Sequence, residues 1–157
     1  MKKLLFILCV FLFTQCEKLV MDREYSLTLK NNSDFSIIYF TGVNINPLPA
    51  VYPDTTLYVD SFSMEPTIIV SPGEIKYLIR SGVHLSNTIK ELPADTLSIY
   101  LFHIDTLKNN TWSDVRDGYK ILKRYDLSLE DLEYLDYKLS YPPDAKMSGV
   151  KMYPPYP

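Results

Sequence analysis

His103 and Asp105 are the best candidates for chemistry in this chain, because imidazole and carboxylate groups both bind zinc. On a strand, residues two positions apart point to the same face, so one metal ion could contact both. The other histidine, His84, has no sequence spacing that brings it near them. A metal-dependent enzyme is therefore a remote alternative. The interpretation we prefer is structural: His103 belongs to a sheet, and Asp105 opens a turn over residues 105–110.

Cys16 is the second candidate, and its chemistry would be lipid attachment. Two lysines precede an apolar run over residues 4–13, which is the pattern of a secretory signal and is too short to span a bilayer. The segment Phe13-Thr14-Gln15-Cys16 resembles the lipobox, the site at which bacterial lipoproteins are cleaved and acylated on cysteine. The sequence therefore predicts a lipoprotein signal peptide over residues 1–15, lipid attachment at Cys16 and a tether over residues 16–24.

An ordinary secretory signal with an incidental cysteine is the alternative for this segment. Phe13 stands where leucine is commonest in the lipobox, and Gln15 stands where a small residue is usual. The cysteine count favours the lipid. Cys9 would leave with the signal, so Cys16 would be the one thiol of an exported chain, without a partner for a disulfide.

The expected location is the cell envelope, with acyl chains on Cys16 holding the protein to a membrane, which we expect to be the outer membrane. Each buried methylene contributes about 0.8 kcal/mol, so two or three chains on one cysteine anchor a protein firmly. The sequence leaves open whether the domain faces the periplasm or the medium. The formal net charge is −3, and loss of Lys2 and Lys3 with the signal makes it more negative. We therefore expect no nucleic-acid partner.

Sequence patterns of the common catalytic sites are missing from the chain. There is no Gly-x-Ser-x-Gly motif, and the 5 glycines form neither type of nucleotide-binding loop. Glycoside hydrolysis needs two facing carboxylates, whereas Glu130, Asp131 and Glu133 suit the first turn and the solvent face of a helix. We expect a protein that is not an enzyme and has no cofactor.

The elements that would position a site are clearest in the C-terminal half. Residues 97–104 are apolar, aromatic or β-branched almost throughout, which predicts a central strand buried on both faces. Further strands are predicted over residues 121–126 and 137–141, and Pro142-Pro143 ends the second of them.

Two short helices are predicted between these strands. Thr111 with Asp114, and Ser128 with Asp131, have the spacing of a capping box, and apolar residues at helical spacing follow each pair. Another turn or two of helix is predicted over residues 86–92.

The N-terminal half has the alternating pattern of short strands. Residues 25–29 and 35–40 are predicted to form a hairpin. Residues 67–70 and 75–79 flank Ser71-Pro72-Gly73-Glu74, which has the proline and glycine positions of a type II turn, so a second hairpin is predicted there.

These elements predict a mostly β fold: an antiparallel β-sandwich-like single domain over residues 25–143, with two or three short helices mainly in its C-terminal half. Residues 144–157 are predicted to be an extended Tyr/Pro tail, which either docks through its tyrosines or extends freely.

A ligand would be bound through aromatic side chains. The chain has 13 tyrosines, whose rings and hydroxyl groups suit sugars and protein partners. The long irregular segment over residues 42–66 is the expected binding loop, with Tyr52 and Tyr58 as its candidate contacts. A glycan or an envelope protein is the expected partner. A structural subunit that assembles by strand exchange through the tail is the alternative.

The last third of the chain resembles a group of small lipoproteins of Bacteroidetes. The resemblance is carried by Asp105-Thr106-Leu107, Trp112-Ser113-Asp114-Val115, residues 119–132 and residues 150–155. It implies a lipid anchor. It implies no activity, and no catalytic or binding residue follows from it.

Overall fold

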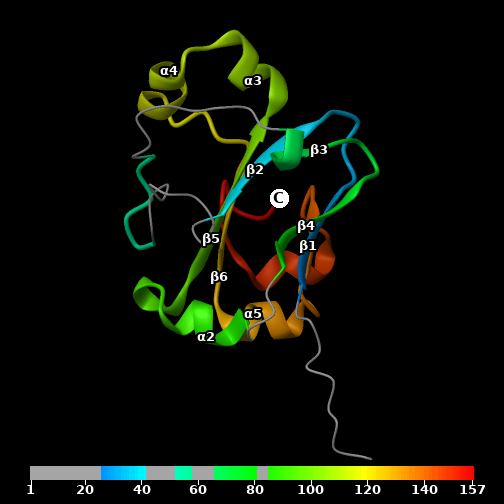
Figure 1. Ribbon diagram of the computed structural model, residues 1–157, viewed down its shortest axis with the longest axis vertical. Helices are drawn as coiled ribbons and strands as arrows, with labels where there is room; N and C mark the ends of the chain where they lie inside the picture. Colours follow the sequence, from blue (N-terminus) through cyan, green and yellow to red (C-terminus); the bar gives the residue numbers. More distant parts are fainter. Residues whose placement is uncertain (1–25, 42–51, 58–65, 81–84) are drawn as a thin grey trace, which may run out of the picture.

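The computed structural model describes residues 26–41, 52–57, 66–80 and 85–157, and within them eight strands form two sheets that pack face to face (Figure 1). Sheet A has the order β4 (Ile75–Arg80), β1 (Ser26–Asn31) and β7 (Lys138–Tyr141). Sheet B has the order β3 (Ile69–Val70), β2 (Ile37–Thr41), β5 (Leu97–His103), β6 (Lys123–Leu127) and β8 (Lys151–Tyr153). All paired strands are antiparallel except β1 and β7. The predicted mostly β, antiparallel sandwich-like fold is confirmed.

Strand β5 is the predicted central strand, and both of its faces are buried. Leu97, Ile99 and Leu101 point into the core between the two sheets. Tyr100 and Phe102 point to the other face of sheet B, into a smaller apolar cluster beneath the helices α3 (Ile104–Asn109) and α4 (Trp112–Asp117). Full burial of one such side chain stabilises a fold by about 1.5–3 kcal/mol. Around β5, sheet B is therefore covered on one face by sheet A and on the other by the residues of the smaller apolar cluster.

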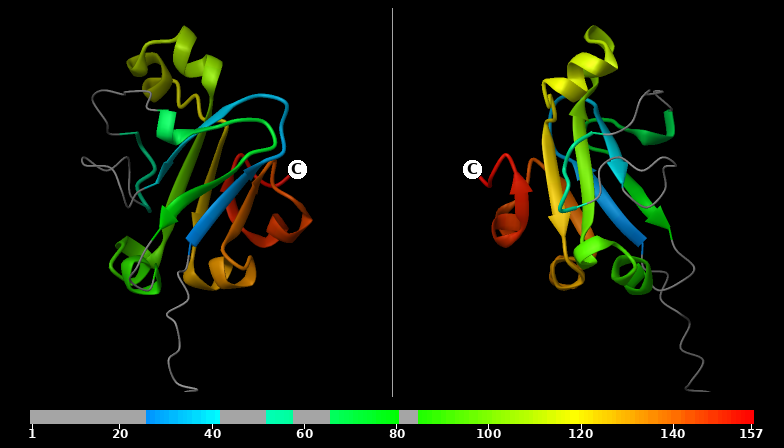
Figure 2. Two further views of the ribbon diagram at one scale, coloured as in Figure 1. Left: turned by 45° about the vertical axis from the view of Figure 1, so that its right-hand side comes forward. Right: turned by 90° about the vertical axis from the view of Figure 1, so that its left-hand side faces the viewer.

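The short α-helices close the two ends of the sandwich (Figures 1 and 2). α3 and α4 lie at one end, and α2 (Leu85–Lys90) and α5 (Leu129–Tyr134) lie at the other. Both predicted capping boxes are present. Thr111 accepts from the backbone N–H of Asp114 at the start of α4, and Ser128 accepts from that of Asp131 at the start of α5. In each box the aspartate accepts from the backbone N–H of the capping residue in return.

Both predicted hairpins are wrong, because the strands of each pair lie in different sheets. β1 pairs with β4 and β7, whereas β2 pairs with β3 and β5. The predicted turn at residues 71–74 does form, with Gly73 at φ 77° and the N–H of Glu74 donating to Ser71 O over 3.0 Å. It carries the chain from β3 in sheet B to β4 in sheet A, so the turn was predicted and its strand pairing was not.

The physical reason lies at Asn31, which joins the two connections between the sheets. Its side-chain amide donates to Phe35 O over 2.7 Å and to Val70 O over 3.0 Å. Its backbone N–H donates to Glu74 O, and its carbonyl oxygen accepts from the N–H of Gly73. The connection from β1 to β2 and the connection from β3 to β4 therefore pass from one sheet to the other side by side.

Residues 144–157 differ from the extended tail that the sequence predicts. They contain a 3-10 helix (Ala145–Gly149) and strand β8, which pairs with β6. Met147 is fully buried and Val150 nearly so, and both belong to the core between the sheets. The buried ammonium group of Lys123 donates to Pro154 O over 2.8 Å. This segment thus runs from sheet A to sheet B along one side of the sandwich.

Several predictions concern residues outside the described ranges: the signal peptide, Cys16 and its tether, most of the expected binding loop including Tyr58, and His84. Leu57, the last residue of the described segment over residues 52–57, is not in a strand. It is buried, in the smaller apolar cluster. In the part of the chain that the structure describes, no helix is long and apolar enough to cross a membrane.

Candidate functional site

His103 and Asp105 form a helix cap. The strand β5 ends at His103, and the turn predicted at residues 105–110 is wrong, since α3 begins at Ile104. The Nδ1 atom of His103 accepts a hydrogen bond from the backbone N–H of Asp105 over 3.0 Å, and the centres of the His103 and Phe35 rings are 4.3 Å apart. The lone pair of Nδ1 is therefore used by the helix. No three potential metal-ligating side chains gather among the described residues.

A second group of side chains lies on the outer face of sheet B, where β6 and β8 pair. Arg124 faces Tyr153 across the two strands, and Asp126 faces Lys151. Tyr119, from the segment after α4, and Tyr52, from the segment over residues 52–57, complete the group. We call Tyr52, Tyr119, Arg124, Lys151 and Tyr153 the tyrosine–cation cluster.

The floor of this cluster is a buried ion pair. The guanidinium of Arg124 donates to both carboxylate oxygens of Asp126, with N–O distances of 3.0–3.1 Å, and the hydroxyl of Ser98 donates to the same carboxylate over 2.7 Å. The side chain of Asp126 is fully buried, and that of Arg124 is 11% exposed. Burial alone would lower the pKa of Arg124, but the hydrogen bond and the charge of Asp126 reverse this and raise it. These charge-assisted hydrogen bonds hold the two side chains in a fixed position.

Two of the tyrosines are arranged around this ion pair. Arg124 donates to the hydroxyl of Tyr119. The rings of Tyr119 and Tyr153 meet edge to face with centroids 5.5 Å apart, and the guanidinium carbon of Arg124 lies 5.9 Å from the ring centre of Tyr153. Tyr153 nevertheless leaves 47% of its surface exposed. It is an exposed ring on a rigid support, which is what an aromatic contact for a ligand requires.

Lys151 and Tyr52 form the rim of the cluster. The ammonium group of Lys151 donates to the hydroxyl of Tyr52 over 2.6 Å and lies 4.6 Å from the centre of its ring. No carboxylate oxygen of the described residues lies within 4.0 Å of that ammonium group. An exposed cation beside a half-buried ring can bind hydroxyl groups and anions of a ligand.

Two acidic groups next to the cluster, Asp126 and Tyr100, are both buried. The carboxylate of Asp126 is fully buried and is shared by Arg124 and Ser98. Burial, with a smaller effect of the nearby Tyr119, raises the pKa of Tyr100 well above its ordinary value, so this phenol stays protonated at neutral pH.

Of the residues in the cluster, the sequence predicted Tyr52 alone. Residues 144–157, which contain Lys151 and Tyr153, were predicted to be an extended tail. Arg124, Lys151 and Tyr153 were missed because they meet through the long-range pairing of β6 with β8. The alternation of Arg124 and Asp126 with buried neighbours along β6 was the one local sign of a polar outer face.

The chain was compared with protein-family models, with curated proteins and with solved structures. None of them matches it. Any role of this face has therefore to be inferred from its own residues.

Proposed function

We propose that this chain is a lipid-anchored, non-enzymatic binding protein of the cell envelope, and that its tyrosine–cation cluster binds a saccharide. The observation that supports the ligand class is the exposed ring of Tyr153, held by Arg124 and Tyr119 next to Tyr52 and Lys151. Sugar rings have apolar faces that stack on tyrosine, and hydroxyl groups at their edges that bond to polar side chains. The cluster offers both kinds of contact within one face.

The anchor is supported by the sequence at Cys16, and the expected membrane is the outer membrane. Its test is the intact mass of the membrane-extracted protein beside its Cys16→Ala form. A diacyl or triacyl mass increment that disappears with the substitution is the expected result. A free thiol at Cys16, or cleavage elsewhere, would contradict the anchor.

The ligand class is tested by binding to an array of oligosaccharides, followed by calorimetry with those that bind. Tyr153→Ala removes a stacking partner worth about 0.5–1.5 kcal/mol, so the Kd should rise up to about tenfold. Tyr134→Ala is the matched control, because this tyrosine is 65% exposed and lies on α5, outside the cluster. Equal affinity of the two variants for every saccharide bound would contradict the proposal.

Assembly by strand exchange is the second candidate, and one observation favours it. β8 has three residues and lies at the edge of sheet B, so another copy could supply the same strand. A chain that ends at Val150 keeps the buried Met147 and lacks β8. Concentration-dependent oligomers of the full chain that are lost in this shorter form would support exchange. A full chain that is monomeric at all concentrations would exclude it.

A further inference from the structure

The outer face of sheet A exposes two apolar side chains that neither core uses. Ile75 is 59% exposed and Tyr77 is 48% exposed. They are two positions apart on β4, so they share one face. Across the strand pairing they lie opposite Lys30 and Thr28 of β1. Neighbouring exposed apolar side chains of this size on a sheet are a sign of a contact surface.

Two cations frame this pair. The guanidinium carbon of Arg80 lies 4.3 Å from the ring centre of Tyr77, and Lys30 is opposite Ile75. No carboxylate oxygen within the described ranges lies within 4.0 Å of either cation. We call Lys30, Ile75, Tyr77 and Arg80 the β1–β4 patch.

The carboxylates at the border of the patch have partners of their own. Glu74 lies 3.8 Å from the ammonium group of Lys76, and Asp136 is paired with Lys138. The β1–β4 patch therefore combines two apolar side chains with two cations that have no carboxylate of the described residues beside them, on a chain whose net charge is negative. Such a combination is complementary to a phospholipid membrane, which has an apolar interior and phosphate groups at its surface.

The chain enters the domain at one end of the patch. β1 begins at Ser26, whose partner in the sheet is Arg80. If Cys16 carries the lipid, as the proposed function holds, then the ten residues from there to Ser26 span at most about 35 Å. β4, with its six residues, is about 20 Å long. The whole patch therefore stays within reach of the membrane that holds the anchor. The tether gives the patch a high effective concentration relative to that membrane.

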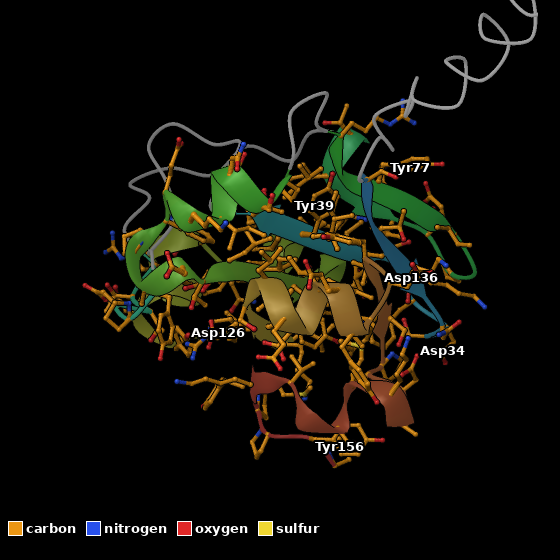
Figure 3. All side chains as sticks on the ribbon, turned by 90° about the horizontal axis from the view of Figure 1, so that it is seen from below. Asp34, Tyr39, Tyr77, Asp126, Asp136 and Tyr156 are labelled. Carbon is orange, nitrogen blue, oxygen red and sulfur yellow. The ribbon has the colours of Figure 1, made fainter. Side chains whose placement is uncertain are left out.

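We propose that the β1–β4 patch lies against the phospholipid headgroups of that membrane. Ile75 and Tyr77 enter the boundary between headgroups and acyl chains, where tyrosine is favoured, and Lys30 and Arg80 contact phosphate oxygens. Figure 3 shows Tyr77 and Asp126 on opposite sides of the molecule, as expected for the outer faces of two packed sheets. A membrane on the side of Tyr77 leaves the tyrosine–cation cluster facing the aqueous phase.

The test measures depth in the membrane for the lipidated full-length protein in phospholipid vesicles. With Cys16 acylated, a cysteine placed by Tyr77→Cys is the one free thiol, and it takes a fluorophore. Tyr134→Cys is the matched control, since this tyrosine is also exposed but lies on α5. We expect lipids with a nitroxide at the headgroup to quench the label at position 77 several-fold more than the label at position 134.

The outcomes separate the two proposals. Protein that floats with the vesicles while both labels are quenched equally overturns the patch and leaves the anchor standing. Protein without an acyl mass that does not float overturns the anchor, and the patch with it.

A second reporter, Ile75→Cys, should be quenched as strongly as position 77, and adding Arg80→Glu should weaken that quenching. Circular dichroism of each variant shows that the domain remains folded.

Discussion

The side-chain amide of Asn31 donates a 3.0 Å hydrogen bond to the carbonyl oxygen of Val70, although the two residues are 39 positions apart. Both residues are fully buried. Asn31 ends β1 in sheet A and Val70 ends β3 in sheet B, so one side chain fixes where the chain changes sheets. The same amide group bonds Phe35 O, and its oxygen accepts the N–H and the hydroxyl of Ser33.

Replacing Asn31 by alanine should therefore destabilise the domain strongly. The carbonyl oxygens of Phe35 and Val70 and the N–H of Ser33 would lose their side-chain partner, and a buried polar group left unpaired costs about 1–3 kcal/mol. We expect the free energy of unfolding in urea to fall by about 3 kcal/mol. Asn32→Ala is the control, because that side chain is exposed and should change stability by less than about 0.5 kcal/mol. Similar midpoints for the two variants would contradict this role of Asn31.

The buried pair of Arg124 and Asp126 leads to a second prediction. The side chain of Arg124 is only 11% exposed, and Asp126→Ala takes away its carboxylate partner. Removing one partner of a buried ion pair costs about 3–5 kcal/mol of stability. Asp117→Ala breaks an exposed pair with Arg116 and should cost less than about 1 kcal/mol. Urea unfolding of both variants measures the difference. A loss below about 1 kcal/mol for Asp126→Ala would show that water reaches the pair, against the burial described above.

The parts of the fold that the sequence predicted are those that neighbouring residues determine. The capping boxes at Thr111 and Ser128 each lie within four residues, and the run that forms β5 is apolar enough to specify a buried strand by itself. The turn at residues 71–74 follows from its proline and glycine. The N-terminus of α3 was missed because its cap is His103, which is not among the usual capping residues.

The parts that failed depend on contacts between distant residues. Alternating strands beside a turn suggest a hairpin, and nothing local shows that Asn31 will bond Val70 and send the strands to different sheets. The tyrosine–cation cluster is of the same kind, since Arg124 and Tyr153 become neighbours only when β8 pairs with β6. Tyr52 was predicted for a general reason, as an aromatic residue in a long irregular segment.

The contact of Lys151 with Tyr52 gives a prediction about dynamics. Lys151→Met removes the hydrogen bond that ties the segment over residues 52–57 to β8. Amide hydrogen exchange at Thr56 and Leu57 should become several-fold faster, while the melting temperature stays the same, because exposed polar contacts contribute little to global stability. Lys146→Met, which removes a cation 5.3 Å from the ring centre of Tyr134, is the control and should leave this segment unchanged. Unaltered exchange in the Lys151 variant would mean that other contacts hold the segment.

The last prediction concerns alkaline pH. Burial raises the pKa of Tyr39, Tyr100, Tyr125 and Tyr141 in the folded protein above the ordinary value of 10.0, with smaller effects of nearby acidic groups on the first three. A raised pKa in the folded state means that the unfolded state loses its proton first. The stabilisation is therefore complete below pH 10 and is lost as the pH rises above it. Burial lowers the pKa of Lys123 below its ordinary value of 10.5, so the folded state loses this proton before the unfolded state does. Up to pH 10.5 this effect raises stability with pH and offsets part of the loss caused by the tyrosines.

Each buried tyrosine weakens the fold by at most about 1.4 kcal/mol per pH unit above pH 10, so the four together should destabilise the domain progressively as the pH rises. We expect the four buried tyrosines to ionise together with unfolding, above pH 10. Absorbance of tyrosinate, followed alongside circular dichroism, shows whether their ionisation accompanies the loss of structure. Ionisation of these four rings near pH 10 without loss of structure would contradict their burial. Tyr125→Phe tests the sign directly, because it removes one group that titrates on unfolding and should make the alkaline transition less steep.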